Sequence, residues 1–401
     1  MSAALDLRPQ PLSWQNQHPL ARVKEIAPLL RAEAPKIEAG RRLTPAVLDA
    51  LHARGLYRCL VPKEYGGDEA QPAEAVRMVE AMAQADASTT WCVGQATVCA
   101  MSAAYVKPHV AREIWGDDPR GVLAWGYAQG ARAKVVDGGY LVTGQWGFGS
   151  GGHHATWLGG HCQIEERDGS LRRGPDGNPI ERTMLMRQDQ VSWEENWDVI
   201  GLRGTGSDTY RVKDLFVPED YTVRRDVDEE RVHPGLLYRF STTNMYASCF
   251  AGVMMGIARR MLEDFKELAG SKVPTATTKL MRDSAVTQLF VGEQEAKLRQ
   301  ARAWLLEVLR EIWDDVQHTG RLSMDQKMMI RLASTSAIHR AREVVESCYR
   351  EAGTTAIFEK NPFERPCRDM HAAGQQVQAR TAHIEAVGAH MLGVQTSQRF
   401  I

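Results

Sequence analysis

The 401-residue sequence lacks the features that mark membrane proteins and nucleic-acid-binding proteins. Its 49 Lys and Arg residues are balanced by 50 Asp and Glu residues, so there is no excess positive charge to bind nucleic acid or an anionic membrane. The best apolar run, residues 247–258, is too short to span a membrane and contains a serine and two glycines. Residues 1–17 are polar and lack the apolar segment of a signal peptide. We therefore expect neither nucleic acid nor a membrane as a partner.

The seven cysteines are scattered, and none belongs to a Cys-x-x-Cys pair. An odd set of single cysteines in a long chain is typical of reduced thiols, which predicts a cytoplasmic protein. His153, His154 and His161 lie close together in the sequence, but their spacing matches no zinc motif. We therefore predict no metal site.

The character of the sequence changes twice, which predicts three domains in an α+β fold that is mostly α. Residues 1–118 carry apolar side chains at helical spacing and form the predicted α-helical N-terminal domain. Residues 119–230 contain short segments rich in Thr, Val, Tyr and Trp between glycine turns, which predicts a central β-barrel or sandwich. Residues 231–401 are predicted to form a C-terminal helix bundle. Strands are expected at 155–164, 183–186, 191–200 and 210–217, and long helices at 242–268, 280–318, 324–351 and 376–392.

A glycine-rich loop at residues 144–157 follows a predicted hairpin and contains Trp146, Phe148 and Ser150. Glycines allow the backbone to approach a flat ligand, aromatic rings can stack on it, and a serine hydroxyl can form a hydrogen bond. These properties suit a planar heterocycle. The spacing of its glycines also matches the dinucleotide-binding motif, but a strand-like segment follows where that motif requires a helix. A glycine-rich hairpin with packed aromatic side chains is the structural alternative.

Four segments, in this order, resemble the acyl-CoA dehydrogenase fold family of flavoproteins. Their sequences are Val61-Pro-Lys-Glu-Tyr-Gly-Gly67, Gly138-Gly-Tyr-Leu-Val-Thr-Gly144-Gln-Trp146, Gly201-Leu-Arg-Gly-Thr-Gly-Ser207 with Val217-Pro-Glu219, and Pro362-Phe-Glu-Arg-Pro-Cys-Arg368-Asp369. The resemblance covers about residues 45–395. It implies an α-helical N-domain, a central β-barrel, a C-terminal four-helix bundle and a homotetramer with flavin between subunits.

Two regions differ from the pattern of the acyl-CoA dehydrogenases. Their catalytic glutamate lies eight or nine residues beyond the Arg-Asp pair, where this sequence has Gln376 and Val377, and neither can abstract a proton. Their Arg-x-x-Phe-Gly motif, which holds the FAD pyrophosphate, is replaced by residues 270–279, so Arg282 is the remaining candidate to bind a flavin phosphate. A desaturase with an unusual base is therefore the second hypothesis for function, and a catalytically silent binding or scaffold tetramer is the third.

The segments Trp146-x-Phe148-x-Ser150-Gly and Arg368-Asp-Met-His371-Ala-Ala resemble instead the oxygenase components of two-component flavin-dependent monooxygenases. This resemblance implies reduced FMN or FAD, bound transiently and delivered by a separate NAD(P)H-flavin reductase, with O2 as co-substrate. It implies a small, aromatic or heteroaromatic substrate. It also implies that Ser150 hydrogen-bonds flavin N5 and that Trp146 and Phe148 form an aromatic wall that excludes water.

Other residues have predicted roles in the same site, each with a structural alternative. His371 is the candidate catalytic base and substrate contact, because many related hydroxylases have histidine where this chain has Gln376. Predicted flavin contacts are Trp125, Gly149, Thr205, Ser207 and Arg282, and predicted substrate contacts are Trp91 and Tyr127. Core packing is the alternative for Trp91, turn closure for Thr205 and Ser207, and a solvated helix face for Arg282.

Overall fold

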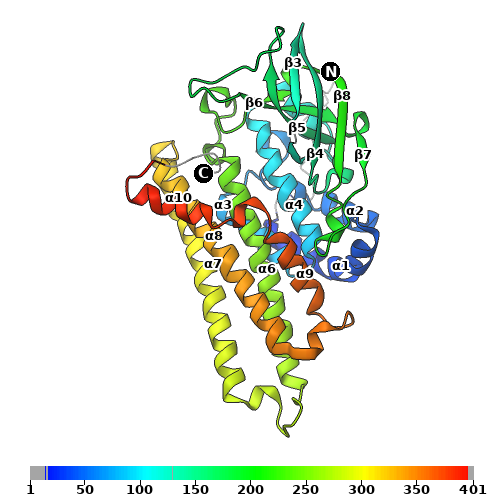
Figure 1. The fold of residues 1–401 in the computed structure, drawn as a ribbon, viewed down its shortest axis with the longest axis vertical. Helices are drawn as coiled ribbons and strands as arrows, with labels where there is room; N and C mark the ends of the chain where they lie inside the picture. The colour runs from blue at the N-terminus through cyan, green and yellow to red at the C-terminus, as the bar shows by residue number, and fades with distance from the viewer. Residues whose placement is uncertain (1–13, 15–16, 129, 396–401) are drawn as a thin grey trace, which may run out of the picture.

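The computed structural model describes residues 14, 17–128 and 130–395, which form helices, then strands, then helices again (Figure 1). The first described helices are α1 (Pro19–Gly40), α2 (Pro45–Ala53), α3 (Pro72–Ala83), α4 (Ala87–Cys99) and α5 (Pro108–Ala111). All but α4 begin with proline, whose fixed φ suits the first helical turn. Every residue of α4 is buried, as expected for a helix that is apolar on nearly all sides.

The strands form one mixed sheet in the order β7-β8-β4-β3-β5-β6-β9, with β1 paired to β5 and β2 paired to β4. Among the described strands, only the pairs β1–β5 and β3–β5 are parallel. The strand predicted at 191–200 is correct only for its start, because the backbone N–H of Trp197 leaves the sheet and donates to Asp208 Oδ1. The bounds are β1 (Leu123–Trp125), β2 (Tyr127–Ala128), β3 (Arg132–Val136), β4 (Gly139–Gly147), β5 (Trp157–Glu165), β6 (Glu181–Arg187), β7 (Ser192–Glu194), β8 (Thr209–Pro218) and β9 (Thr222–Val223).

In the described residues after 241, three long α-helices are followed by two short α-helices. They are α6 (Thr242–Ser271), α7 (Ala285–Thr319), α8 (Met324–Ala352), α9 (Glu364–Ala373) and α10 (Ala382–Met391). The helix predicted at 376–392 begins later, because the Gln376 side chain accepts from the Gln378 backbone and starts a separate short turn. The predicted domain boundaries at 118/119 and 230/231 fall in connections between these elements, and they stay predictions.

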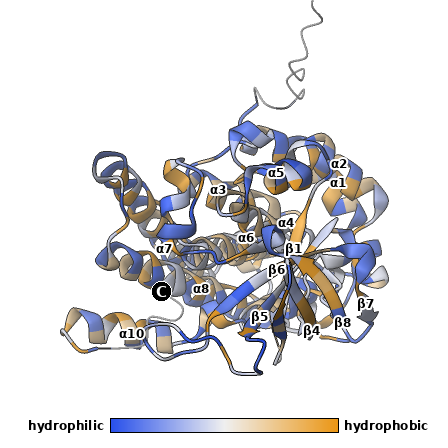
Figure 2. Ribbon diagram, turned by 90° about the horizontal axis from the view of Figure 1, so that it is seen from above, coloured by the Kyte–Doolittle hydropathy of each residue, from blue (hydrophilic) through white to orange (hydrophobic). Residues whose placement is uncertain are grey.

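Helices α4 and α6 occupy the centre of the molecule. Helix α6 packs against α8 on one side and against α3 and α4 on the other. Seen from above, α4 and α6 lie between the strands and the long helices α7 and α8, and strand β1 is strongly hydrophobic where it approaches α4 (Figure 2). The sheet therefore approaches the central helices where β1 packs against α4.

A contact between the loop at residues 199–207 and helix α9 joins the β part to the C-terminal helices. The backbone N–H of Leu202 donates to Asp369 Oδ1 at 2.6 Å, and Arg368 Nη1 donates to the carbonyl oxygen of Ile200 at 2.6 Å. Gly201 allows this approach, because a Cβ atom there would overlap the backbone of Arg368. Two of the sequence motifs are thus in direct contact, through residues 167 and 168 positions apart.

We expect Gly201→Ala to destabilise the protein by about 2 kcal/mol, because the new methyl group would push α9 away from the loop. Chemical denaturation measures the effect. Gly270→Ala is the matched control, since nothing lies within 4 Å of a Cβ there and alanine favours a helix. Equal stability of the two variants would contradict the proposed contact.

The pKa of Asp369 is raised to about 7 by burial, with the charge of Asp86 acting in the same direction and Leu202 N–H opposing it. The native state therefore favours the protonated acid, and stability is lost as pH rises from the unfolded pKa of about 4 through the native value. We expect the Tm of the wild type to fall between pH 5 and pH 8 more than that of Asp369→Asn. Thermal unfolding across this range tests the prediction, and parallel profiles would refute it.

Candidate active site

Three hydroxyl groups from the two glycine-rich loops form one chain of hydrogen bonds. Ser150 Oγ lies 2.7 Å from Ser207 Oγ, which lies 2.7 Å from Thr205 Oγ1. The Thr205 hydroxyl donates to the carbonyl oxygen of Leu202 at 2.8 Å. All three side chains are buried. The loops that the sequence indicated separately therefore meet at one point, and we call this set of bonds the hydroxyl chain.

The Leu202 carbonyl fixes the direction of the hydroxyl chain, because a carbonyl only accepts and each hydroxyl has one proton. Thr205 gives its proton to Leu202, so Ser207 donates to Thr205 and Ser150 donates to Ser207. The indole N–H of Trp91 donates to Ser150 Oγ at 3.2 Å and uses one of its two lone pairs. The other lone pair can accept a hydrogen bond from a ligand, whereas the Ser150 proton is already committed.

Trp91 is the first of four aromatic side chains that follow one another through the interior. Its ring stacks on Phe250 with centroids 4.1 Å apart and an angle of 11°. Phe250 stacks on Tyr246 at 5.6 Å, and Tyr246 lies 6.2 Å from Trp125 at a steep angle. These four residues, from α4, α6 and β1, form what we call the aromatic row. It gives the site a buried apolar side.

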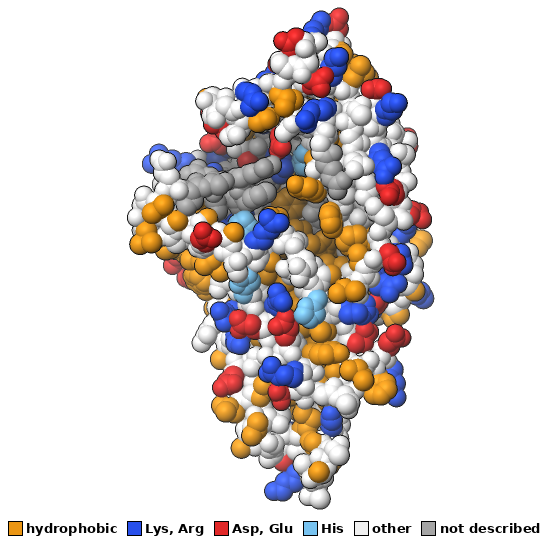
Figure 3. Space-filling view, in the orientation of Figure 1, with side chains coloured by type: hydrophobic (Ala, Val, Ile, Leu, Met, Phe, Trp, Pro, Cys, Tyr) orange, Lys and Arg blue, Asp and Glu red, His pale blue; other side chains and the backbone are white. Residues whose placement is uncertain are grey.

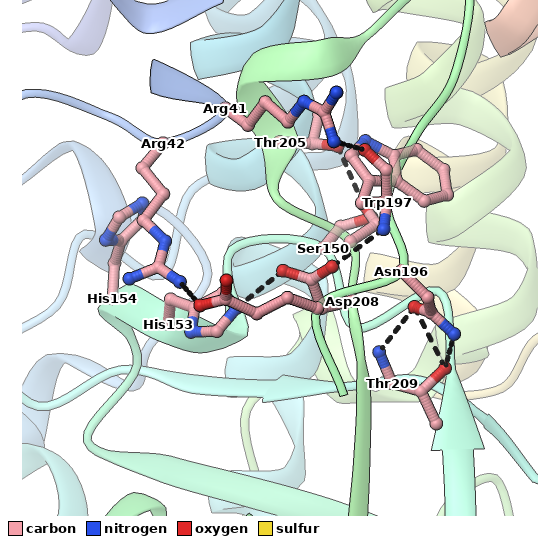
Figure 4. Close-up of polar contacts among 12 residues, drawn as sticks. Arg41, Arg42, Ser150, His153, His154, Asn196, Trp197, Thr205, Asp208 and Thr209 are labelled. Carbon is pink, nitrogen blue, oxygen red and sulfur yellow. Dashed lines mark hydrogen bonds and ion pairs between the residues drawn. The ribbon is translucent and has the colours of Figure 1, made fainter. Parts of the chain in front are cut away.

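Asp208 joins the two loops beside the hydroxyl chain (Figure 4). Its carbonyl accepts from the Gly149 N–H, its Oδ1 accepts from the Trp197 N–H, and its Oδ2 lies 2.8 Å from His153 Nε2. The His153 ring also stacks on Trp193 at 3.9 Å. Burial lowers the pKa of His153, and the hydrogen bond to Asp208 acts in the opposite direction. These contacts hold the backbone on both sides of Ser150 and Ser207.

Phe148 and Tyr127 expose their rings next to this site. Phe148 is 62% exposed, because its left-handed backbone (φ 57°) turns the side chain out of the direction of strand β4. Tyr127 is 66% exposed and lies opposite Gly147 in the β2–β4 pair. Phe148, a predicted flavin contact, and Tyr127, a predicted substrate contact, thus lie on the same outer edge of the sheet, where both rings can contact a ligand.

Trp146 has a different environment from the aromatic wall that the sequence predicted. It has no exposed surface, stacks on Tyr210 at 5.3 Å, and its indole N–H donates to the carbonyl of His161. Gly160 gives it room, because a Cβ there would lie 2.7 Å from the indole ring. Trp146 is therefore a core residue of the sheet. Of the two rings in the predicted aromatic wall, Phe148 is the one that is exposed.

Three other predicted residues lie apart from the hydroxyl chain. Arg282 is exposed in the connection between α6 and α7, at the far end of the molecule from β4 (Figure 1), and so does not border this site in the same chain. His371 is half-buried on α9, and its side chain has no hydrogen bond among the described residues. Gln376 is anchored to Gln378, and its Nε2 has no partner in the described part of the chain.

The clustered histidines do not share a site that would suit a metal ion. His154 Nε2 accepts from the Leu43 N–H, and burial lowers the pKa of His154 to about 4. His161 Nδ1 lies 2.7 Å from Thr183 Oγ1 on the neighbouring strand β6, and burial lowers the pKa of His161 well below the usual value. Residues 14, 17–128 and 130–395 contain no group of three or more side chains that could hold a metal ion.

No described helix is long and apolar enough to cross a membrane.

Sequence reasoning missed Tyr246, Phe250 and Asp208. Tyr246 and Phe250 are four residues apart on α6, and this spacing is the same for any buried helix face. Asp208 directly follows Ser207, but nothing in the sequence links it to His153. For Trp146 the sequence did contain a signal. It lies at even spacing along β4 from the buried residues Tyr140 and Val142, which places all three on the same face of the strand.

Comparison with known families and proteins agrees with this architecture. Residues 23–109 match the family described as acyl-CoA dehydrogenase, N-terminal domain, and residues 248–381 match acyl-CoA dehydrogenase, C-terminal domain. The chain is 30% identical over 365 residues to an indole-3-acetate monooxygenase of Pseudomonas putida, covering 91% of each chain. It is 26% identical over 398 residues to the oxygenase component of an FADH2-dependent resorcinol hydroxylase of a Rhizobium strain, covering 95% of each.

The fold is also that of a solved structure, the HsaA monooxygenase from Mycobacterium tuberculosis. The TM-score is 0.86 at 24% identity, with 96% of this chain and 99% of that chain covered. The predicted three-part fold class and the predicted family are both confirmed. The chain therefore belongs to the acyl-CoA dehydrogenase superfamily and, within it, to the flavin-dependent monooxygenases, and it is an oxidoreductase.

Proposed function

We propose that this chain is the oxygenase component of a two-component flavin-dependent monooxygenase. It uses reduced FMN or FAD, bound transiently, and O2 to hydroxylate or oxygenate a small aromatic or heteroaromatic compound. The names of two relatives, which act on indole-3-acetate and resorcinol, support the substrate class. The designation of one as an oxygenase component supports a separate NAD(P)H-flavin reductase as partner. We place both proteins in the cytoplasm, as the scattered single cysteines of this chain predict.

The observation that carries the proposal is the free lone pair on Ser150 Oγ. N5 of a reduced flavin carries a proton, and Ser150 can only accept, because its own proton is committed to Ser207. The site therefore fits the reduced cofactor, which supplies the electrons and the atom at which O2 reacts. Ser150 would hold the N5 proton in place. The exposed rings of Phe148 and Tyr127 would cover the flavin plane, and Gly149 has no side chain to obstruct it.

The aromatic row supports a dry reaction site on the other side of Ser150. Trp91 and Phe250 are buried and apolar, and Trp91 contacts Ser150 directly. Excluding water there would slow loss of the N5 proton from a bound reduced flavin. We infer that the substrate ring stacks on this row, so that Trp91 has both a substrate-binding role and a positioning role toward Ser150.

His371 is our candidate for the catalytic base. Its side chain is half-buried without a partner among the described residues, and its helix α9 packs against α4 and α6, which carry most of the aromatic row. Gln376 has no basic lone pair, which disfavours the desaturase hypothesis. A scaffold protein would not need a hydroxyl chain with a fixed direction. Substitution of Ser150 distinguishes the two hypotheses, because it should impair catalysis but not a scaffold role.

We also infer a homotetramer in which Arg282 binds the flavin phosphate of a second copy. Arg282 lies on the α6–α7 connection, and the nearby first turns of α7 expose Val286 and Leu289 by 74% and 64%. Hydrophobic side chains are visible over this lower part of the molecule (Figure 3). Apolar side chains exposed at such a spacing on a long helix are typical of subunit contacts.

Ser150→Ala should shorten the time before bound reduced flavin is reoxidised by about tenfold, because it removes one hydrogen bond to the flavin. The protein is mixed with anaerobically reduced FMN or FAD, then with oxygenated buffer, and the return of oxidised-flavin absorbance is followed by stopped flow. We expect the wild type to delay this return relative to free flavin. Reoxidation at the rate of free flavin in the wild type, with both cofactors, would refute the proposed function.

Thr205→Val should also accelerate reoxidation, because it removes the bond to Leu202 that fixes the direction of the hydroxyl chain. More of the consumed O2 should then be released as hydrogen peroxide than is incorporated into the product. Thr209→Val is the matched control, since its hydroxyl bonds Asn196 outside the chain (Figure 4). An equal effect of both variants would indicate a structural role only.

Leu289→Glu should lower the molecular mass of the assembly in solution, because a charge would enter the inferred subunit contact. Light scattering after size-exclusion chromatography measures this mass. Val232→Glu is the control, since Val232 is 54% exposed but lies in a loop far from α7 in sequence. A monomeric wild type would refute the tetramer.

A further inference from the structure

Trp197 lies between β7 and the glycine-rich loop at residues 199–207, and each of its polar groups has a partner from elsewhere in the chain. Its backbone N–H donates to Asp208 Oδ1 at 2.8 Å, and its carbonyl oxygen accepts from Arg41 Nη1 at 3.3 Å (Figure 4). Its indole N–H donates to the carbonyl oxygen of Leu202 at 3.1 Å. Three hydrogen bonds therefore hold both the backbone and the half-buried side chain of Trp197 in one place.

The residues on either side of Trp197 are anchored as well. Asp198 forms an ion pair with Arg41 at 2.8 Å. The Asn196 side chain donates to the Thr209 hydroxyl at 3.0 Å and accepts from the Thr209 backbone N–H at 3.2 Å. An exposed ion pair contributes little to stability by itself. Anchors on three consecutive residues, however, leave the Trp197 ring little freedom to move.

Phe148 has one aromatic neighbour among the described residues, and that neighbour is Trp197. The two rings meet edge to face, with centroids 5.9 Å apart and an angle of 82° between their planes. The rest of the Phe148 ring is largely exposed, because its left-handed backbone turns the side chain out of the direction of β4. An exposed ring exchanges between rotamers unless a neighbour restricts it. Trp197 is therefore the aromatic contact that can fix where the Phe148 ring lies.

Asp208 sets the distance between these two rings, because it binds the backbone beside each of them. Its carbonyl oxygen accepts at 3.1 Å from the N–H of Gly149, which directly follows Phe148. Its Oδ1 accepts from the backbone N–H of Trp197. One buried residue thus holds the loop that carries Phe148 against the segment that carries Trp197.

The Trp197 indole is also anchored on the carbonyl that directs the hydroxyl chain. The Leu202 carbonyl oxygen accepts from Trp197 Nε1 and from the Thr205 hydroxyl. Ser150 lies at the other end of the hydroxyl chain, two residues after Phe148. The position of the Phe148 ring is thus tied through Trp197 to the group that would bind flavin N5.

We propose that Trp197 is a positioning residue for the flavin, which holds the Phe148 ring over the flavin plane while Ser150 binds N5. A ring that is already fixed loses less conformational entropy when the cofactor binds, so the affinity for reduced flavin is higher. Trp197 acts through Phe148 and does not need to touch the flavin itself. This inference rests on the proposed function, because that function places the flavin against Phe148 and Ser150.

A double-mutant cycle on flavin affinity tests this role. Anaerobically reduced FMN and reduced FAD are each titrated into the protein in a calorimeter, and the flavin that the wild type binds more tightly is used. We expect Trp197→Leu to weaken binding about fivefold, the effect of one aromatic pair. In the Phe148→Leu background the same substitution should change the affinity by less than about twofold, because the ring that Trp197 positions is gone.

Trp193→Leu is the matched control for the cycle. Trp193 is a second half-buried tryptophan close by in the sequence, but its ring stacks on His153 instead of Phe148. Its effect on flavin affinity should therefore be the same with and without the Phe148 ring.

Trp197→Phe tests rescue by a conservative change. It keeps a ring beside Phe148 and should bind reduced flavin more tightly than Trp197→Leu does. Thermal unfolding shows whether Trp197→Leu is folded. If it is not, Trp197→Phe takes its place in the cycle, because it has lost the indole N–H that anchors the ring on Leu202, and its own loss of affinity should disappear in Phe148→Leu.

Equal losses for Trp197→Leu with and without the Phe148 ring would overturn the inference and leave Trp197 as a structural residue of its segment. The absence of any loss in both backgrounds would overturn it too. If the wild type binds neither reduced flavin, the proposed function fails and this inference fails with it. Tight binding by the wild type together with an additive cycle would reject the role of Trp197 alone and retain the monooxygenase.

Discussion

The hydrogen bond from the Thr205 hydroxyl to the Leu202 carbonyl determines what the rest of the site can do. A carbonyl cannot donate, so this single bond sets the direction of each bond that follows it and leaves Ser150 as an acceptor. Without it, the three hydroxyls could reverse direction together, and Ser150 could then donate. A reduced flavin and an oxidised flavin differ in whether N5 carries a proton, so this direction selects the reduced form.

The Leu202 carbonyl is itself held by distant parts of the chain. The backbone N–H of Leu202 donates to Asp369 of helix α9, and the adjacent Gly201 contacts the backbone of Arg368. Arg368 also pairs with Glu38 of α1 at 2.7 Å. The direction of a hydrogen bond near Ser150 thus depends on contacts among the N-terminal helices, the sheet and the C-terminal helices. This gives a physical reason for the three sequence motifs at 144–150, 201–207 and 362–369 to occur together.

The aromatic row gives the site its second property, a continuous apolar side between two polar ends. One end is Ser150, which receives the indole N–H of Trp91, and the other is Trp125, over whose ring the Arg225 guanidinium lies. Hydrogen-bond direction at Ser150 and the apolar side beside it are thus supplied by different residues.

The sequence by itself determined the order of helices, strands and helices, the starts of most helices at prolines, and the loop motifs that contain Ser150, Thr205 and Ser207. These are local signals, because turns, caps and periodic apolar residues depend on near neighbours. Only the tertiary structure decided that Trp146 packs in the core while Phe148 is exposed, since a left-handed backbone at residue 148 ends the alternation of the strand. Likewise, Tyr246 and Phe250 lie in one row with Trp91 through contacts across the fold, and no spacing along the chain distinguishes them from ordinary packing residues.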